Sequence, residues 1–236
     1  MTRETTLSRL RRELRKRSSR KYAASLRRFF KTGPGEYGEK DVFIGVRVPR
    51  IRSAVSEFKG ISLSDTARLL RSRIHEERLA ALIILSSKFR SSAEDGRKKI
   101  FNVYLSNTRY INNWDLVDLS APGIAGAFLL NKSRKVLYSL ASSGSMWERR
   151  IAVLATFRFI AKDDFRDSLK IGEMLLDDEE DLIHKAVGWM LREIGKRNLA
   201  VEEKFLRKHR RKMPRTMLRY AVERFPESKR RHYMAK

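Results

Sequence analysis

The chain has 236 residues, of which 42% are hydrophobic, enough for a folded core in one large or two small domains. Lysine and arginine number 53 against 28 acidic residues, and the net charge of +25 is far more than solubility requires. The absence of cysteine excludes disulfides and thiolate metal sites, and no apolar run approaches the roughly 20 residues of a membrane-spanning helix.

So large a positive charge would repel itself unless a polyanion is the normal partner. Nucleic acid is the first candidate, because lysine and arginine neutralise phosphates and release counterions there. An anionic membrane surface is the second. The N-terminal stretch is polar and basic throughout and has no hydrophobic region of a secretory signal. We therefore expect an intracellular protein.

The first 31 residues carry apolar positions at helical spacing, with basic residues on the other faces. The pattern predicts two basic amphipathic helices, over residues 4–17 and 18–31. Their apolar stripes are narrow and carry no bulky aromatic cluster for membrane insertion, which makes the membrane alternative the weaker one. The stripe residues are Leu7, Leu10, Leu14, Tyr22, Leu26, Phe29 and Phe30.

A structured loop is predicted over residues 32–48. Four of the 12 glycines and two of the five prolines lie between Lys31 and Arg50. Three of the glycines match the G-x-G-x-x-G pattern of dinucleotide-binding proteins. The context does not fit, because a helix precedes the glycines where a strand is needed and no βαβ unit follows. We therefore do not assign a nucleotide site to the loop.

Residues 49–225 show helical periodicity throughout, and no stretch alternates as a strand would. This predicts an all-α fold in a single domain: an α-solenoid of HEAT-like helical repeats with a concave basic face, followed by a basic tail over 226–236 with one short turn. Because internal similarity is weak, the repeat assignment depends on the number of helices and their short connections. The expected helices are 49–58, 62 or 64 to 73, 75–89, 91 or 92 to 105, 119–130, 133–141, 145–161, 163–176, 179–197, 199–210 and 214–225.

The most informative stretch is YINNWDLVDLSAPG, residues 110–123. If it is helical, Trp114 and Asp118 are four residues apart and lie on one face. A carboxylate beside an indole can stabilise a positive charge, by Coulomb attraction and by cation–π contact. The alternative is that Trp114 belongs to the core and that Asp115 and Asp118 are solvated or cap a helix.

The helix over 179–197 places an indole within a basic face. Trp189 lies off the apolar stripe, on a line with Lys185, Arg192 and Lys196. Such a face suits a nucleic acid. The alternative is an indole half-buried against a neighbouring helix, with long cationic side chains around it.

Arg149 and Arg150 lie near the start of the helix over 145–161, where positive charge opposes the helix dipole. Cations in this position suggest an external anion such as a phosphate. The alternative is a surface arginine that is tolerated there, because the dipole penalty is small when the side chain is exposed.

Metal and cofactor chemistry find no support in the sequence. The four histidines follow no ligand spacing, and there is neither a Ser-His-Asp nor a Walker arrangement. We therefore expect neither a metal nor a cofactor. The histidines are His75, His184, His209 and His232.

Taken together, these stretches resemble the AlkD family of DNA alkylation repair glycosylases, which are built of HEAT-like repeats. The resemblance extends from about residue 37 to 225. It is carried by VFIGVRVPRIR from Val42, HEERLAALIIL from His75, NWDLVD from Asn113, WERRIAVL from Trp147 and KAVGWMLREIGK from Lys185.

The resemblance implies roles for individual residues. Asp118 corresponds to the catalytic carboxylate, Trp114 and Trp189 to two indoles that contact the damaged nucleotide, and Arg150 to an arginine that holds the DNA backbone. The expected DNA-binding residues are Arg150, Arg149, Tyr37, Arg47, Lys185 and Arg192.

The activity that the resemblance implies is hydrolytic release of purines alkylated at N3 or N7, such as 3-methyladenine and 7-methylguanine, from double-stranded DNA. The family grips the backbone without flipping the base out, and a monomer is expected. Two alternatives remain: a non-catalytic helical-repeat protein that binds DNA or RNA, and a scaffold for an acidic protein. The charge of +25 is high for the family, so we expect the basic N-terminal helices to bind DNA outside the site or to bind a partner.

Overall fold

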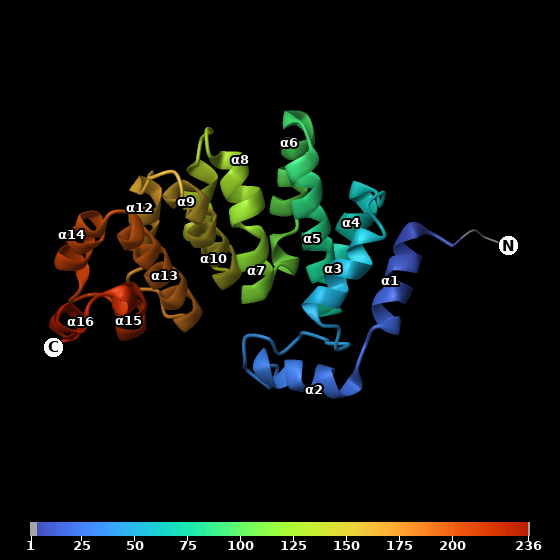
Figure 1. Ribbon diagram of the computed structural model, residues 1–236, viewed down its shortest axis with the longest axis horizontal. Helices are drawn as coiled ribbons and strands as arrows, with labels where there is room; N and C mark the ends of the chain where they lie inside the picture. The colour runs from blue at the N-terminus through green and yellow to red at the C-terminus, as the bar shows by residue number, and fades with distance from the viewer. Residues whose placement is uncertain (1–3, 236) are drawn as a thin grey trace. The chain divides into compact units, whose positions relative to one another are not determined.

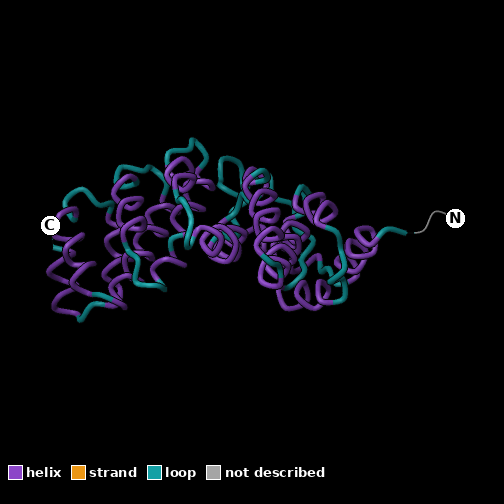
Figure 2. Tube along the Cα trace, turned by 90° about the horizontal axis from the view of Figure 1, so that it is seen from above, coloured by secondary structure: helices purple, strands orange, loops and turns teal. Residues whose placement is uncertain are grey.

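The computed structural model describes residues 4–235. The chain is 69% helical, and Figure 2 shows only helices and loops along the described trace. Extended pairing over these residues is limited to one isolated parallel bridge between Val42 and Ile74. The predicted all-α helical-repeat fold is therefore confirmed.

The chain divides into two compact units, of which the first ends at Ser120 and the second begins at Ala121. The expectation of a single domain stays a prediction. The first unit contains α1 (Thr6–Lys16), α2 (Arg20–Phe29), α3 (Val48–Ser56), α4 (Leu63–Leu70), α5 (His75–Ser91), α6 (Glu94–Leu105), a 3₁₀ turn (Thr108–Tyr110) and α7 (Trp114–Ser120), labelled in Figure 1 where there is room.

Short polar side chains determine where the first helices begin. The hydroxyl groups of Thr5, Ser19 and Ser62 accept hydrogen bonds from backbone N–H groups in the first turns of α1, α2 and α4. The apolar stripe of α1 is buried as predicted. On α2, Phe29 is 63% exposed while Phe30 is buried. The helix ends at Phe29, and the two rings contact each other edge-on at a centroid distance of 5.1 Å.

Helix α5 is the centre of the first unit, because α1, α3, α4, α6 and α7 all pack against it. Its residues from His75 to Ser86 are all buried, and the run from Leu79 to Leu85 is apolar on every side of the helix. The first turn of α5 is also buried, but its side chains are polar or charged: His75, Glu76, Glu77 and Arg78. Buried polar groups need partners, and the partners of these residues build the candidate site.

The second unit is a similar stack of helices around α13. The elements are a π-helical turn (Pro122–Gly126), α8 (Ala127–Leu129), α9 (Lys135–Ala141), α10 (Met146–Ala155), α11 (Phe157–Ile160), α12 (Arg166–Met174), α13 (Asp181–Arg197), α14 (Leu199–His209), α15 (Arg215–Ala221), a 3₁₀ turn (Val222–Arg224) and α16 (Glu227–Met234). Helices α10, α11, α12, α14 and α15 pack against α13.

Three expected helices are interrupted. The helix expected over 119–130 is replaced by the π-helical turn and α8, because Pro122 lacks the N–H group that a regular helix requires. The helix expected over 145–161 divides at Thr156, whose hydroxyl donates to the carbonyl of Val153. The helix expected over 214–225 ends in a 3₁₀ turn.

The tail contains more structure than the expected short turn. Residues Glu227–Met234 form α16, which buries Tyr233 against the ring of Phe225 at a centroid distance of 5.5 Å. A single aromatic residue among charged ones produces no helical periodicity, so the sequence pattern did not predict this helix. Within residues 4–235, no helix is long and apolar enough to cross a membrane.

Candidate active site

Helix α7 carries the two residues that the sequence singled out. Because α7 runs from Trp114 to Ser120, Trp114 and Asp118 lie one turn apart on the same face, as predicted. Asp118 is half-buried and lies close enough to Tyr104 to act on its ionisation. Burial raises the pKa of the Tyr104 phenol, the hydrogen bond with Ser120 opposes this rise, and the negative charge of Asp118 adds to it.

His75, at the start of α5, links α7 to the glycine-rich loop. Its Nε2 lies 2.8 Å from Oδ2 of Asp115, and its Nδ1 lies 2.9 Å from Oδ2 of Asp41. Burial alone would lower the pKa of the imidazole. The hydrogen bonds and negative charges of Asp115 and Asp41 outweigh burial and raise the pKa to about 9. His75 is therefore a buried imidazolium that donates to two carboxylates at neutral pH.

Asp41 is the other centre of this network. Its carboxylate accepts hydrogen bonds from His75, from Arg78 at the first turn of α5, and from the amide of Asn113 at 2.9 Å. Burial raises the pKa of Asp41, but these donors and positive charges lower it further than burial raises it. The side-chain oxygen of Asn113 accepts from the backbone N–H of Trp114 at 2.8 Å, so the start of α7 is fixed.

Aromatic rings surround the indole of Trp114. Its ring stacks on Phe30 at a centroid distance of 5.3 Å and meets Phe29 edge-on at 5.8 Å. Its Nε1 donates to the hydroxyl of Tyr37 at 3.3 Å. Trp114 is half-buried and packs on the core of α2 and the loop. The alternative of a core tryptophan is thus partly right, but the indole keeps an exposed portion.

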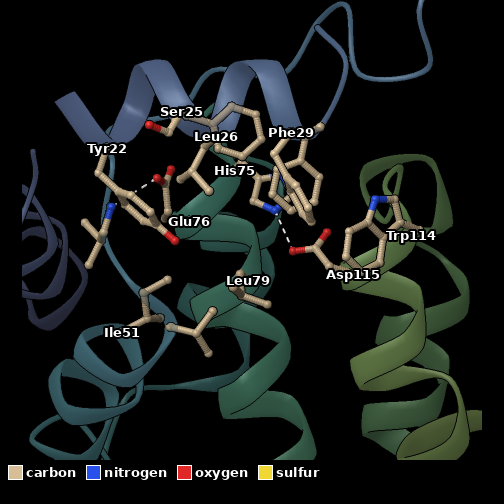
Figure 3. Close-up of a pocket in the computed structure, with 14 residues that line it drawn as sticks. Tyr22, Ser25, Leu26, Phe29, Ile51, His75, Glu76, Leu79, Trp114 and Asp115 are labelled. Atoms are coloured by element: carbon tan, nitrogen blue, oxygen red, sulfur yellow. Dashed lines mark hydrogen bonds and ion pairs between the residues drawn. The ribbon is translucent and has the colours of Figure 1, made fainter. Parts of the chain in front are cut away.

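A largely apolar pocket of about 520 Å³ lies between α2 and the first turns of α3, α5 and α7. In Figure 3, Leu26 and Phe29 descend from α2, Ile51 and Leu79 form the lower wall, and Trp114 and Asp115 stand at the opposite end from Tyr22. The dashed line from His75 to Asp115 marks the ion pair at the edge of the pocket. Of the candidate residues on α7, Trp114 therefore lines a preformed cavity, whereas Asp118 is not among its lining residues.

Glu76 holds the loop over α5. Its buried carboxylate accepts hydrogen bonds from the backbone N–H groups of Ile44, Gly45 and Val46, at 3.1, 2.7 and 3.2 Å. Three donors to one carboxylate fix the loop backbone firmly. This arrangement places Phe43 against His75, with ring centroids 4.6 Å apart.

The structure places the second indole and its cationic neighbours in the second unit. Trp189 on α13 is half-buried, and its Nε1 donates to Glu193 at 3.0 Å. The cations around it are paired: Lys185 with Asp181 at 2.7 Å, and Arg192 with Glu223. Asp181 and Glu223 therefore partly neutralise the helix face around Trp189 that the sequence predicted to be basic.

Arg149 and Arg150 make contacts within the second unit. Arg149 donates from Nε to Oδ2 of Asp178 at 2.6 Å and from Nη1 to the carbonyl of Ser143 at 3.0 Å. Arg150 is only 5% exposed, and its Nη1 donates to the carbonyl of Leu182 at the start of α13. The sequence suggested an external anion for Arg149. In the structure Asp178, an acid 29 residues away, pairs with this guanidinium.

The first unit brings together Trp114, Asp118 and Tyr37, and it also holds Arg47 at the start of α3. Sequence reasoning missed the network of His75, Asp41 and Asp115. These residues are 34 and 40 positions apart, and no local spacing links them. Among the described residues, no group of three or more histidine, cysteine or acidic side chains could hold a metal ion.

Comparisons with known proteins give one family match and one structural neighbour. A family model described as DNA alkylation repair enzyme matches residues 10–225. A solved structure, a predicted DNA alkylation repair enzyme from Enterococcus faecalis, has 16% sequence identity and a TM-score of 0.69, with 89% of this chain and 98% of that chain covered. At this identity the structure supports the fold alone. A search of curated proteins found no match.

Proposed function

Because the chain belongs to the family of DNA alkylation repair enzymes, we propose that it is a monofunctional DNA glycosylase that releases purines alkylated at N3 or N7 from double-stranded DNA. The expected substrates include 3-methyladenine and 7-methylguanine. The product would be a free base and an abasic site in an intact strand.

One observation carries the proposal most directly: Asp118 and Trp114 share a face of α7, and a buried imidazolium fixes the start of that helix. A carboxylate held rigidly beside an indole is suited to stabilise a cation that forms during a reaction. Rigidity matters here because such stabilisation requires charges that are already in place before the reaction.

The chemistry follows from the leaving group. A purine alkylated at N3 or N7 is already cationic, so the electron pair of the C1′–N bond moves to the base without prior protonation. Positive charge develops on the sugar, as in glycoside hydrolysis. In the proposal, Asp118 stabilises this oxocarbenium ion and orients a water molecule, whose oxygen bonds to C1′ and whose proton is lost to the carboxylate or to solvent. No metal or cofactor is required.

The remaining candidates would hold DNA. Trp189 would offer a second indole to the damaged nucleotide, and Arg150 would hold the backbone nearby. Tyr37, Arg47, Lys185 and Arg192 complete the proposed contacts. Arg149 and Arg150 are the weakest members, because Asp178 already pairs with the guanidinium of Arg149 and Arg150 is only 5% exposed. We also propose that the protein acts as a monomer.

The rival candidate is a non-catalytic protein that binds DNA or RNA. The net charge of +25 favours it, because charge accounts for binding without any chemistry. The discriminating experiment incubates methylated duplex DNA with the wild-type protein in the presence of a chelator and separates released bases by chromatography. We expect release of both methylated purines with uncleaved strands. Tight binding without any released base would favour the rival.

A further inference from the structure

A second pocket, of about 410 Å³, lies at the N-terminal end of α2 within the first unit. Four of its eight lining residues are cationic, and none is acidic, unlike the apolar pocket beside Trp114. The lining residues are Arg17, Ser19, Lys21, Tyr22, Ser25, Gly45, Arg47 and Arg50. We call this cavity the basic pocket.

Three of the four cations of the basic pocket have no acidic partner among the described residues. Lys21, Arg47 and Arg50 are exposed, and within residues 4–235 their side chains form neither a hydrogen bond nor an ion pair. The guanidinium of Arg47 lies over the ring of Tyr22, 4.9 Å from its centroid, which holds the group in place without neutralising it. Like charges gathered this closely favour an anion between them.

The walls of the basic pocket offer further donors. Arg17 is held by Glu57 through Nη2 at 2.6 Å, but its Nη1 is buried and has no partner. The pocket also lies at the first turns of α2 and α3, neither of which contains an acidic residue. Partial positive charge at these helix ends adds to that of the side chains.

Backbone packing keeps the basic pocket in shape. Gly45 has a φ of +81°, and a Cβ atom at this position would lie 2.1 Å from the carbonyl oxygen of Ser19. The loop can therefore approach the start of α2 this closely only with glycine. Glu76 holds the same glycine from the α5 side through its backbone N–H. The start of α2 and the residues that lead into α3 are thus held together before any ligand binds.

We propose that the basic pocket binds a phosphodiester group of a DNA strand. Exposed cations can be reached by a polymer, and guanidinium groups match phosphate oxygens in geometry and charge. The basic pocket lies along the first half of α2 and shares Tyr22 and Ser25 with the apolar pocket beside Trp114. Its cation on α2, Lys21, precedes Phe30, which stacks on Trp114, by nine residues. At about 1.5 Å per residue this is roughly 14 Å, or about four nucleotides at 3.4 Å per step. That spacing from the damaged nucleotide rests on the proposed function; the phosphate site itself does not.

The test uses a duplex with one tetrahydrofuran abasic analogue, which has no base to release. A single neutral methylphosphonate linkage is moved stepwise along each strand, and the dissociation constant is measured each time. The variant Lys21→Gln/Arg47→Gln/Arg50→Gln is compared with Arg90→Gln/Lys98→Gln/Lys99→Gln, which removes three exposed, unpaired charges elsewhere in the same unit. Far-UV circular dichroism checks that both variants fold.

We expect one linkage, about four nucleotides from the analogue, to weaken wild-type binding by about tenfold when it is neutral. In the pocket variant, making this linkage neutral should leave the dissociation constant unchanged. The slope of log K against log salt should be smaller by about 1 than for the wild type. The control variant should keep the wild-type sensitivity. Equal losses in both variants, or no sensitive linkage, would overturn the proposal.

Two further outcomes are informative. If inorganic phosphate raises the Tm of the wild type but not of the pocket variant, and no linkage is sensitive, the site takes free phosphate and the DNA assignment is wrong. If a sensitive linkage depends on the pocket but lies at no fixed distance from the analogue, the phosphate site stands. The proposed contact of Trp114 with the damaged nucleotide then fails.

Discussion

At the scale of single residues, the candidate site depends on a buried cation that takes no part in the proposed chemistry. His75 joins Asp41 on the loop to Asp115 on α7, and Asn113 links the same carboxylate to the backbone of Trp114. His75 is therefore a positioning residue. Its charge keeps two acids together that would otherwise repel each other beneath the indole.

Stability should depend on pH through His75. Its pKa of about 9 in the folded protein lies above the ordinary value of 6.5, so protonation favours the fold. The contribution is fully present below pH 6.5 and is lost as the pH rises through 9. Its size is on the order of 3 kcal/mol, since one pKa unit corresponds to about 1.4 kcal/mol.

Urea unfolding of the wild type and of His75→Gln from about pH 6 to 10 measures this effect. The difference in the free energy of unfolding between the two proteins should shrink over that window. A constant difference would mean that the pKa of His75 is not raised in the folded protein.

At the scale of elements, the loop over residues 32–48 connects α2 to the rest of the first unit. Gly45 passes close to Ser19, and Glu76 binds three consecutive N–H groups beside it. These contacts hold α2, and with it Phe30, against Trp114. The position of the indole thus depends on a glycine at the far end of α2.

Two glycines with positive φ separate the effect of backbone strain from that of close packing. Gly35 has a φ of +74° and no atom within 4 Å of the place that a Cβ atom would occupy, whereas Gly45 has a φ of +81° and a carbonyl oxygen at 2.1 Å. We expect Gly35→Ala to cost about 1 kcal/mol in the free energy of unfolding, from the left-handed backbone. Gly45→Ala should cost about 3 kcal/mol or more, because α2 must shift.

The measurement is the urea midpoint of each variant, with the intensity of tryptophan fluorescence as a second readout. Similar midpoints for the two variants would show that the approach of the loop to α2 is not important for stability.

The same elements indicate how far sequence reasoning extends. The fold class, the loop over 32–48 and the Trp114–Asp118 pair could be predicted, because each depends on local composition or on spacing within one turn. The pairing of Arg149 with Asp178 and of His75 with Asp41 could not, because these contacts join residues 29 and 34 positions apart. The interruption at Pro122 was predictable in part. A proline indicates that a regular helix is interrupted, but the π-helical form of the interruption depends on packing.

At the scale of the whole molecule, the excess of positive charge is the dominant property, and it is only partly neutralised by internal ion pairs. We expect affinity for undamaged duplex DNA to fall by about 10³ between 50 and 200 mM salt, as for proteins that contact six or more phosphates. Fluorescence anisotropy with a labelled duplex measures this directly. An affinity that hardly changes with salt would argue against DNA as the partner and favour a scaffold for an acidic protein.

The central claim is that Asp118 is the catalytic carboxylate, and one comparison tests it most directly. Single-turnover release of 7-methylguanine from methylated duplex DNA is measured for the wild type, for Asp118→Asn and for the control Asp95→Asn, an exposed acid at the first turn of α6. We predict that Asp118→Asn binds DNA nearly as tightly as the wild type but releases the base at least about a hundredfold more slowly, while Asp95→Asn behaves as the wild type. Equal rates for Asp118→Asn and the wild type would contradict the account.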